Sequence, residues 1–180
     1  LPMAHMYGLA FEFLYEFCYG CHIYFLTRMP SPKIILQAFA EVKPKLVVAV
    51  PLIIEKIIKK NVLPKLETPT MKFLMRVPLV NDKIKAKVRE QLMSAFGGEF
   101  YQIIVGGAAF NQEIEAFLRS INFPYTVGYG MTECGPIISY EDWVNFKAGS
   151  CGKSAPRMET KILSVDPQNV PGEIVTRGDN

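Results

Sequence analysis

The chain has 180 residues, of which 49% are hydrophobic and 21% are charged, as in globular proteins that can build a sizeable core. Its formal net charge of +3 is too weak, and its charges are too scattered, to indicate nucleic-acid binding. The uninterrupted apolar run from Leu46 to Ile54 is well short of the roughly 20 residues of a membrane span, and no stretch resembles a signal peptide.

The first half of the chain alternates helical and strand-like patterns. Leu9 to Cys18 carries aromatic and apolar side chains on nearly every face, which predicts a buried helix, and His22 to Thr27 predicts a short strand. Ser31 can cap a helix that has Pro32 at its first position. The β-branched run "KLVVAV" at 45–50 then predicts a strand buried on both faces.

The second half repeats this alternation. Apolar residues recur at helical spacing at positions 84, 88, 92 and 95, and the pattern ends near Gly97 and Gly98, which predicts a helix. "FYQIIV" at 100–105 predicts another buried strand, Asn111 can cap a helix, and "YTV" at 125–127 predicts the strand after it. The intervening basic cluster is interpreted as a solvated face formed by Lys56, Lys59, Lys60 and Lys65.

This order of elements predicts an α/β fold with a mainly parallel sheet flanked by helices. After about residue 140 the chain changes to shorter β-like stretches, "METKILSV" and "GEIVTRG", which predict the start of a small, mostly β subdomain. We therefore expect residues 1–140 to form the α/β part and residues 141–180 to begin the β-rich subdomain. Ligands of such sheets collect beyond the carboxyl ends of the strands, where "VGGAAF" and "VGYGMTE" both lie.

Four cysteines raise the question of haem, metal ions or disulfides. The stretch "CYGCH" at 18–22 matches the haem-attachment pattern, but it lies inside an aromatic run, where buried thiols are common core residues. Cys134 and Cys151 are not paired at the spacing of metal ligands. We therefore expect reduced cysteines and a cytoplasmic protein.

Two glycine-containing loops carry the candidate chemistry. Gly106 and Gly107 leave a strand end without side chains, which suits either a tight strand-to-helix turn or the close approach of a flat ligand. In the second loop, Gly128 and Gly130 leave open space around Tyr129, whose ring can stack a nucleobase.

The residues after Tyr129 add polar groups suited to a phosphate. Thr132 offers a hydroxyl that can bind a phosphate oxygen, and Glu133 offers a carboxylate that suits Mg²⁺. An ordinary β-turn with a surface Thr-Glu pair is the alternative. The loop is not a Walker loop, because the Gly-Lys-Ser/Thr ending is absent. This order of groups favours a nucleotide site.

"YGMTE" resembles the signature of the adenylate-forming, or AMP-binding, superfamily, which includes acyl-CoA synthetases, firefly luciferase and peptide-synthetase adenylation domains. Four further stretches resemble motifs of the superfamily in the same order: "LPMAHMYG" at 1–8, "VGGAAF" at 105–110, "GSCGKSAP" at 149–156 and "GEIVTRGDN" at 172–180. Together these stretches span almost the whole chain, and the resemblance is closest to long-chain fatty-acid CoA ligases.

The resemblance implies a two-step reaction. A carboxylate attacks the α-phosphorus of MgATP to give an acyl-adenylate, and a thiol, typically that of coenzyme A, then displaces AMP. It also implies that Tyr129 stacks adenine, that Thr132 holds the α-phosphate and that Glu133 ligates Mg²⁺. His5 would stand near the carboxylate end of the acyl site. The remaining nucleotide-binding residues implied are Gly106, Gly107, Ala108, Gly128, Gly130 and Met131.

The resemblance leaves the acid partly open. The aspartate that usually pairs with an amino-acid substrate is missing from "HMYGLAFEFLY", so an amino acid is disfavoured. The aromatic and aliphatic residues of 7–25 could line a tunnel for a medium- or long-chain fatty acid, or could be core. Leu9 stands where some long-chain enzymes place a bulky aromatic gate, so the chain length stays open. One alternative is an aryl or short-chain acid ligase, with bulky groups near Gly107 and Met131; another is a non-catalytic scaffold that retains the fold.

Parts of the superfamily pattern have no counterpart in this sequence. These are the Ser/Thr/Gly-rich phosphate loop, the aspartate that grips the ribose, and the C-terminal domain with its catalytic lysine. We therefore expect an internal fragment that is inactive by itself.

Its expected partners are the small molecules fatty acid, ATP and coenzyme A. Peripheral membrane contact suits a fatty-acid ligase, although no basic amphipathic helix demands it, and the sequence leaves open both the oligomeric state and a carrier protein as thiol acceptor.

Overall fold

The computed structural model describes residues 1–179, apart from the side chain of Lys72. Its helical elements are α1 (Met6–Leu9), the π-helix η1 (Ala10–Leu14), α2 (Tyr15–Cys18), α3 (Pro32–Val42), α4 (Pro51–Asn61), α5 (Leu63–Leu66), α6 (Pro69–Leu74), α7 (Pro78–Ala95), α8 (Gln112–Ser120) and the 3₁₀ turn η2 (Thr132–Cys134). Its strands are β1 (Leu46–Ala49), β2 (Gln102–Val105), β3 (Tyr125–Val127), β4 (Tyr129–Gly130), β5 (Ile137–Tyr140), β6 (Lys153–Ser154), β7 (Met158–Leu163) and β8 (Glu173–Gly178). Asn180, the last residue of "GEIVTRGDN", lies outside the described residues.

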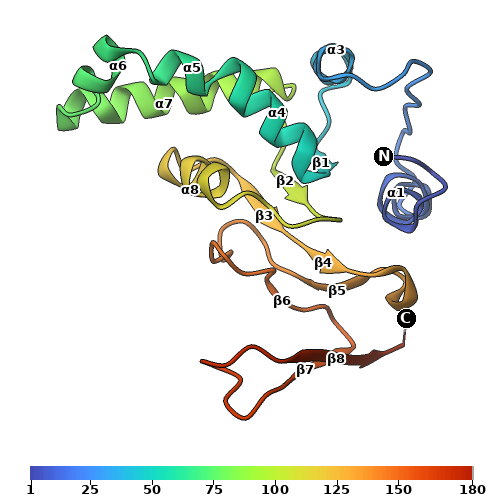
Figure 1. Cartoon of the computed structure of the whole chain (residues 1–180). Coiled ribbons are helices and arrows are strands. Elements are labelled where there is room, and N and C mark those ends of the chain that lie inside the picture. Colours follow the sequence, from blue (N-terminus) through green and yellow to red (C-terminus); the bar gives the residue numbers. More distant parts are fainter. Residues whose placement is uncertain (180) are drawn as a thin grey trace.

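The strands form three small sheets that follow one another along the chain (Figure 1). The first sheet is parallel in the order β1-β2-β3, so β2 lies in its middle. The second is antiparallel in the order β4-β5-β6, and β7 pairs with β8 in an antiparallel hairpin. A parallel sheet with helices followed by short antiparallel strands confirms the predicted fold class. The boundary at residue 140 stays a prediction.

The main hydrophobic core lies between the parallel sheet and its helices. Helix α4 contributes Ile54, Ile57 and Ile58, each with 2% or less of its surface exposed. Helix α8 contributes Ile114 and Leu118, which are equally buried. The strands carry the predicted β-branched residues, but β1 is not buried on both faces as predicted: Val47 and Ala49 are buried, while Leu46 is 37% exposed and Val48 is only partly buried. The core therefore holds the helices against the parallel sheet.

Local signals set the helix ends as predicted. The Ile34 N–H donates to the Ser31 side chain at the start of α3, and Asn111 accepts from two backbone N–H groups at the start of α8. Helix α7 ends at Ala95, before Gly97 and Gly98, both of which have positive φ angles. These three predicted helices are confirmed.

Two predictions for the N-terminal segment are wrong. Residues 9–18 are helical, in three short pieces, but in the part of the chain that the structure describes each of them stays exposed or only partly buried. Residues 22–27 form no strand. Their aromatic and β-branched residues favour extended backbone, yet none of the described strands pairs with them to form a ladder. The structure also adds α4, α5 and α6, for which the sequence analysis named no elements.

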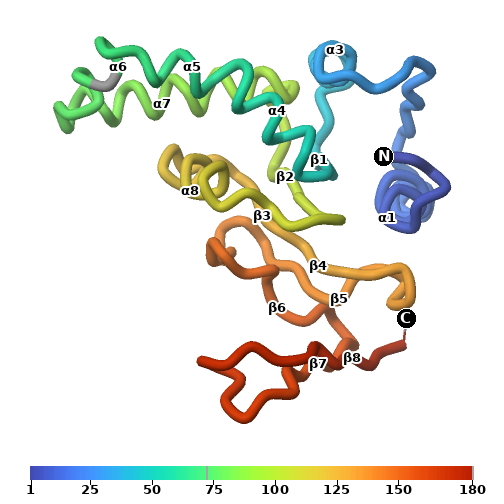
Figure 2. The backbone as a smooth tube through the Cα atoms, viewed as in Figure 1, coloured from blue at the N-terminus to red at the C-terminus, as the bar shows by residue number. Residues whose placement is uncertain are grey.

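Helices α4 to α7 form an arm that extends from the sheet. In Figure 2 the green part of the chain runs outward through α4, α5 and α6 and returns beside them as α7. The four lysines of the predicted solvated face are exposed on it, as expected. Within the described residues, no helix combines the length and the hydropathy that crossing a membrane requires.

Removal of the α8 cap gives a first test. The Asn111 Oδ1 atom accepts from the N–H groups of Glu113 (3.0 Å) and Ile114 (3.1 Å), so we expect Asn111→Ala to lower the free energy of unfolding by about 1 kcal/mol. Ser31→Ala is the matched control, since Ser31 accepts only one longer hydrogen bond, at 3.4 Å, and should cost less. If chemical denaturation showed that both variants lose the same free energy of unfolding, the expected difference between the two caps would be contradicted.

Candidate functional site

The register of the parallel sheet brings the two predicted loops together. Val105 of β2 lies opposite Val127 of β3, and both are the last residues of their strands. The Gly128 N–H donates to the Val105 carbonyl (2.9 Å), and the Gly106 N–H donates to the Ala49 carbonyl (3.1 Å). The loops that follow β2 and β3 therefore start side by side at the carboxyl edge of the sheet, where α/β proteins bind ligands.

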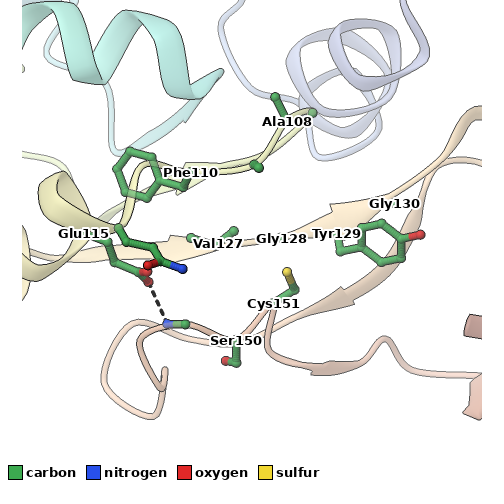
Figure 3. Close-up of a pocket in the computed structure, with 13 residues that line it drawn as sticks. Ala108, Phe110, Glu115, Val127, Gly128, Tyr129, Gly130, Ser150 and Cys151 are labelled. Atoms are coloured by element: carbon green, nitrogen blue, oxygen red, sulfur yellow. Dashed lines mark hydrogen bonds between the residues drawn. The ribbon is translucent and has the colours of Figure 1, made fainter. Parts of the chain in front are cut away.

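Between these loops lies a cavity of about 460 Å³ (Figure 3). Its lining residues come from three segments: Gly107, Ala108, Ala109, Phe110, Gln112 and Glu115; Val127, Gly128, Tyr129 and Gly130; and Gly149, Ser150 and Cys151. The volume lies within the range of pockets that hold small ligands. Glycine and alanine dominate the loop walls, so a flat ligand can approach the backbone closely.

The predicted site residues fall into two groups. Those that line the cavity are Gly107, Ala108, Gly128, Tyr129 and Gly130. Those that lie outside its lining are His5, Gly106, Met131, Thr132 and Glu133. The second loop thus passes from the cavity wall at Gly130 directly to the Thr-Glu pair.

The turn that carries Thr132 and Glu133 is tightly built. The Met131 N–H donates to the Pro136 carbonyl (2.8 Å), and a Cβ atom on Gly130 would lie 2.0 Å from that same carbonyl oxygen. Only glycine fits there. Thr132 and Glu133 are exposed, and within the described residues neither side chain is held by a hydrogen bond or ion pair. Their hydroxyl and carboxyl groups are available to a ligand.

Loop 149–151 forms the third wall, and Glu115 holds it in place. The Glu115 side chain is buried, and its Oε1 atom accepts from the Gly149 N–H (3.0 Å) and from the Tyr125 hydroxyl (3.4 Å). Figure 3 shows the first of these bonds as a dashed line. Burial, followed by the nearby Glu115, raises the pKa of Tyr125, so its hydroxyl remains a donor at neutral pH. No local sequence pattern indicates the bond to Gly149, because its partners lie 34 residues apart in the chain.

The first motif lies against the other side of the β2 loop. His5 is exposed, and its Nδ1 atom accepts from the Tyr7 N–H (3.1 Å) at the start of α1. The Tyr7 hydroxyl donates to the Ile104 carbonyl (3.4 Å), and a Cβ atom on Gly106 would lie 3.0 Å from the Tyr7 hydroxyl oxygen. Burial, then Glu12, raises the pKa of Tyr7. The sequence analysis missed Tyr7, although it belongs to the motif around His5.

The donor set suits a magnesium ion bound together with phosphates. Within the described residues, no group of three or more His, Cys, Asp or Glu side chains could hold a metal ion. Mg²⁺ is usually bound through one or two carboxylates and substrate phosphates, so the exposed Glu133 beside Thr132 fits that mode.

A sequence model of the family described as "AMP-binding enzyme" matches residues 1–180. The chain belongs to this family. All five motif stretches that resemble the superfamily lie within the matched range. Membership therefore agrees with the resemblance found in the sequence.

Curated relatives of the family match over different shares of the chain. Long-chain-fatty-acid–CoA ligase 2 of Schizosaccharomyces pombe is 28% identical over 99% of this chain and 30% of its own length. The 4-coumarate:CoA ligase 1 of Petunia hybrida is 37% identical over 43% of this chain and 16% of its own length. The chain thus spans about 30% of the first of these relatives, and less of the second.

Solved structures of AMP-binding enzymes share the fold. The o-succinylbenzoate coenzyme A synthetase of Bacillus subtilis, in complex with ATP and magnesium, has a TM-score of 0.66 and 21% identity over 99% of this chain and 31% of that one. A benzoate CoA ligase from Burkholderia xenovorans has a TM-score of 0.66 and 18% identity over 98% of this chain and 31% of that one.

The role of Glu115 can be tested by its removal. Glu115→Ala leaves the Gly149 N–H without its acceptor and leaves the Tyr125 hydroxyl with only the Glu115 backbone carbonyl (3.4 Å), so we expect a loss of about 1–3 kcal/mol in the free energy of unfolding. Glu115→Gln keeps an acceptor oxygen and should lose less than half of that. Amide hydrogen exchange at Gly149 should speed up in the alanine variant only. An alanine variant as stable as the wild type would refute this role.

Proposed function

We propose that the chain is the central part of an AMP-forming acid–CoA ligase, which activates a carboxylic acid with MgATP and transfers the acyl group to coenzyme A. One observation carries this proposal. A cavity is walled by small residues of two strand-end loops, and one of these loops continues from Gly130 to an exposed Thr-Glu pair. Family membership and the CoA ligases among the relatives support it.

The proposed roles follow from the positions of the side chains. Tyr129 and the loop at Gly107 and Ala108 would enclose the adenine, because they line the same cavity. Thr132 would donate its hydroxyl to the α-phosphate, and Glu133 would hold Mg²⁺. When bound, Mg²⁺ supplies Lewis-acid neutralisation of charge between the two anionic reactants. The chain's own contribution is to position the nucleotide and to hold the phosphate and the metal.

His5 would orient rather than catalyse. A carboxylic acid substrate is already ionised at neutral pH, so it needs no general base. The Nδ1 atom of His5 already accepts the Tyr7 N–H at the start of α1. We infer that His5 fixes the entry of the chain into α1, and so the position of Tyr7 beside the β2 loop.

The proposed acid is a medium- or long-chain fatty acid. The relative from Schizosaccharomyces pombe is a long-chain-fatty-acid–CoA ligase. The aromatic residues of 7–25 would supply apolar surface for an acyl chain.

A second candidate substrate is an aryl or short-chain acid, and one observation favours it. A Cβ atom on Gly107 would lie 3.7 Å from the Tyr7 ring, so a bulky group stands beside this loop, as a short pocket requires. The 4-coumarate ligase among the relatives agrees with this alternative.

The adenylation chemistry can be tested by carboxylate-dependent ATP–pyrophosphate exchange. The protein assayed should contain this chain together with the segments that complete its relatives, because the isolated 180-residue chain is expected to be inactive. We expect Glu133→Gln to lower exchange by about 10²–10³-fold, as the loss of a charge-stabilising group does. Glu113→Gln is the matched control, since Glu113 is exposed and does not line the cavity.

Other outcomes would change the proposal. Unchanged exchange in Glu133→Gln would refute the metal-binding role. A folded protein with no exchange for any acid would favour the scaffold alternative. Robust turnover by the isolated chain would overturn the assignment of roles.

Tyr7 gives a test that separates the two classes of acid. If its ring closes the pocket, Tyr7→Ala should raise kcat/KM for long fatty acids relative to 4-coumarate by about tenfold or more. Tyr7→Phe, the matched control, keeps the ring and loses only the bond to Ile104, so it should leave this ratio nearly unchanged. A ratio that Tyr7→Ala does not alter would place substrate selection elsewhere.

A further inference from the structure

The arm between β1 and β2 has a charge unlike that of the rest of the chain. Residues 51–96 contain ten lysines and arginines but only four acidic residues, a net charge of +6, while the remaining residues carry a net charge of −3. The modest total of +3 hides this division. The cluster interpreted as a solvated face is therefore one part of a larger basic arm.

The far end of this arm exposes apolar side chains. In Figure 1, α6 and the start of α7 lie at the end of the arm that is most distant from the sheet. Phe73, Val77 and Leu79 lie there, within seven residues of one another, and are 67%, 44% and 80% exposed. Single exposed apolar residues are common, but three at one protruding end form a patch. We call these three residues the tip.

Cationic residues lie close to the tip in sequence, and the cations of the arm are largely unpaired. Arg76 lies between two tip residues in sequence, and Lys83 follows in the first turns of α7; both are exposed. Glu67 and Asp82 are the acidic residues near this end. Among the arm's cationic groups that the structure describes, Lys59 alone forms an ion pair, with Glu55 at 3.9 Å. The positive charge of the arm is therefore available to an external anion.

We propose that this arm binds the surface of an anionic phospholipid bilayer. The tip enters the boundary between headgroups and acyl chains, and the surrounding lysines and arginines contact the lipid phosphates. Apolar insertion and cationic attraction act together in peripheral membrane binding, and each alone is weak. The contact is peripheral and independent of the proposed ligase chemistry.

The charge and shape of the arm disfavour other occupants. A second copy of the chain would bring one basic arm against another, which repels. A nucleic acid would attract the cations, but its phosphate backbone has no apolar layer to receive Phe73 and Leu79. A bilayer presents anionic groups directly above an apolar layer, which matches both the cations and the apolar residues at this end of the arm.

The test is flotation of the protein with vesicles of phosphatidylcholine alone or with about one third phosphatidylglycerol. We expect binding to the anionic vesicles only, and loss of that binding when salt is raised to about 1 M. The variant Phe73→Ser with Leu79→Ser should bind at least about tenfold more weakly, and so should Arg76→Gln with Lys83→Gln. Unchanged circular dichroism and thermal unfolding would show that these exposed substitutions leave the fold intact.

The matched control replaces equally exposed apolar residues elsewhere. Phe25→Ser with Val165→Ser, at positions 64% and 96% exposed, should bind like the wild type. Loss of binding in this control but not in the tip variant would move the contact to the N-terminal aromatic segment and overturn the proposal. Failure to bind any vesicle, or equal binding to neutral and anionic vesicles, would also overturn it. So would binding to duplex DNA that is equally strong in the wild type and in the Phe73→Ser, Leu79→Ser variant.

Discussion

The level ends of the three parallel strands are the constraint on which the rest of the structure depends. Ala49, Val105 and Val127 end β1, β2 and β3 at one edge, and backbone hydrogen bonds from the next residues continue the ladder there. A shift of register by one residue would turn the buried side chains outward, so the core of isoleucines and valines fixes this alignment. The loops after β2 and β3 therefore leave the sheet together, and the cavity lies between them.

A single buried carboxyl group links this edge to the antiparallel layer. Glu115 lies on α8, yet it accepts from Tyr125 on β3 and from Gly149, which follows β5. Since a buried donor without an acceptor is costly, loop 149–151 is held where it closes the cavity. The small sheet β4-β5-β6 thus acts as part of the site as well as a separate layer. Its first turn, tightened by the close approach of Gly130 to Pro136, presents the Thr-Glu pair.

The arm shows how one connection can carry a property that the whole chain lacks. Parallel neighbours such as β1 and β2 require a crossover, and here the crossover consists of four helices. Only α4 and the end of α7 contribute fully buried residues to the core. The outer part of the arm, α5, α6 and the start of α7, contributes no fully buried residue to the core among the side chains that the structure describes. It can therefore expose Phe73 and Leu79 among basic residues without loss of packing.

The sequence by itself determined the features that depend on local chemistry. The caps at Ser31 and Asn111, the buried β-branched strands and the two glycine loops are all encoded within a few residues, and the family motifs lie in those loops. The tertiary structure alone decided that Tyr7 stands beside Gly107 and that Glu115 closes the cavity, because each contact joins residues far apart in the chain. It also decided that residues 22–27 form no strand, since a strand needs a partner as well as β-forming residues.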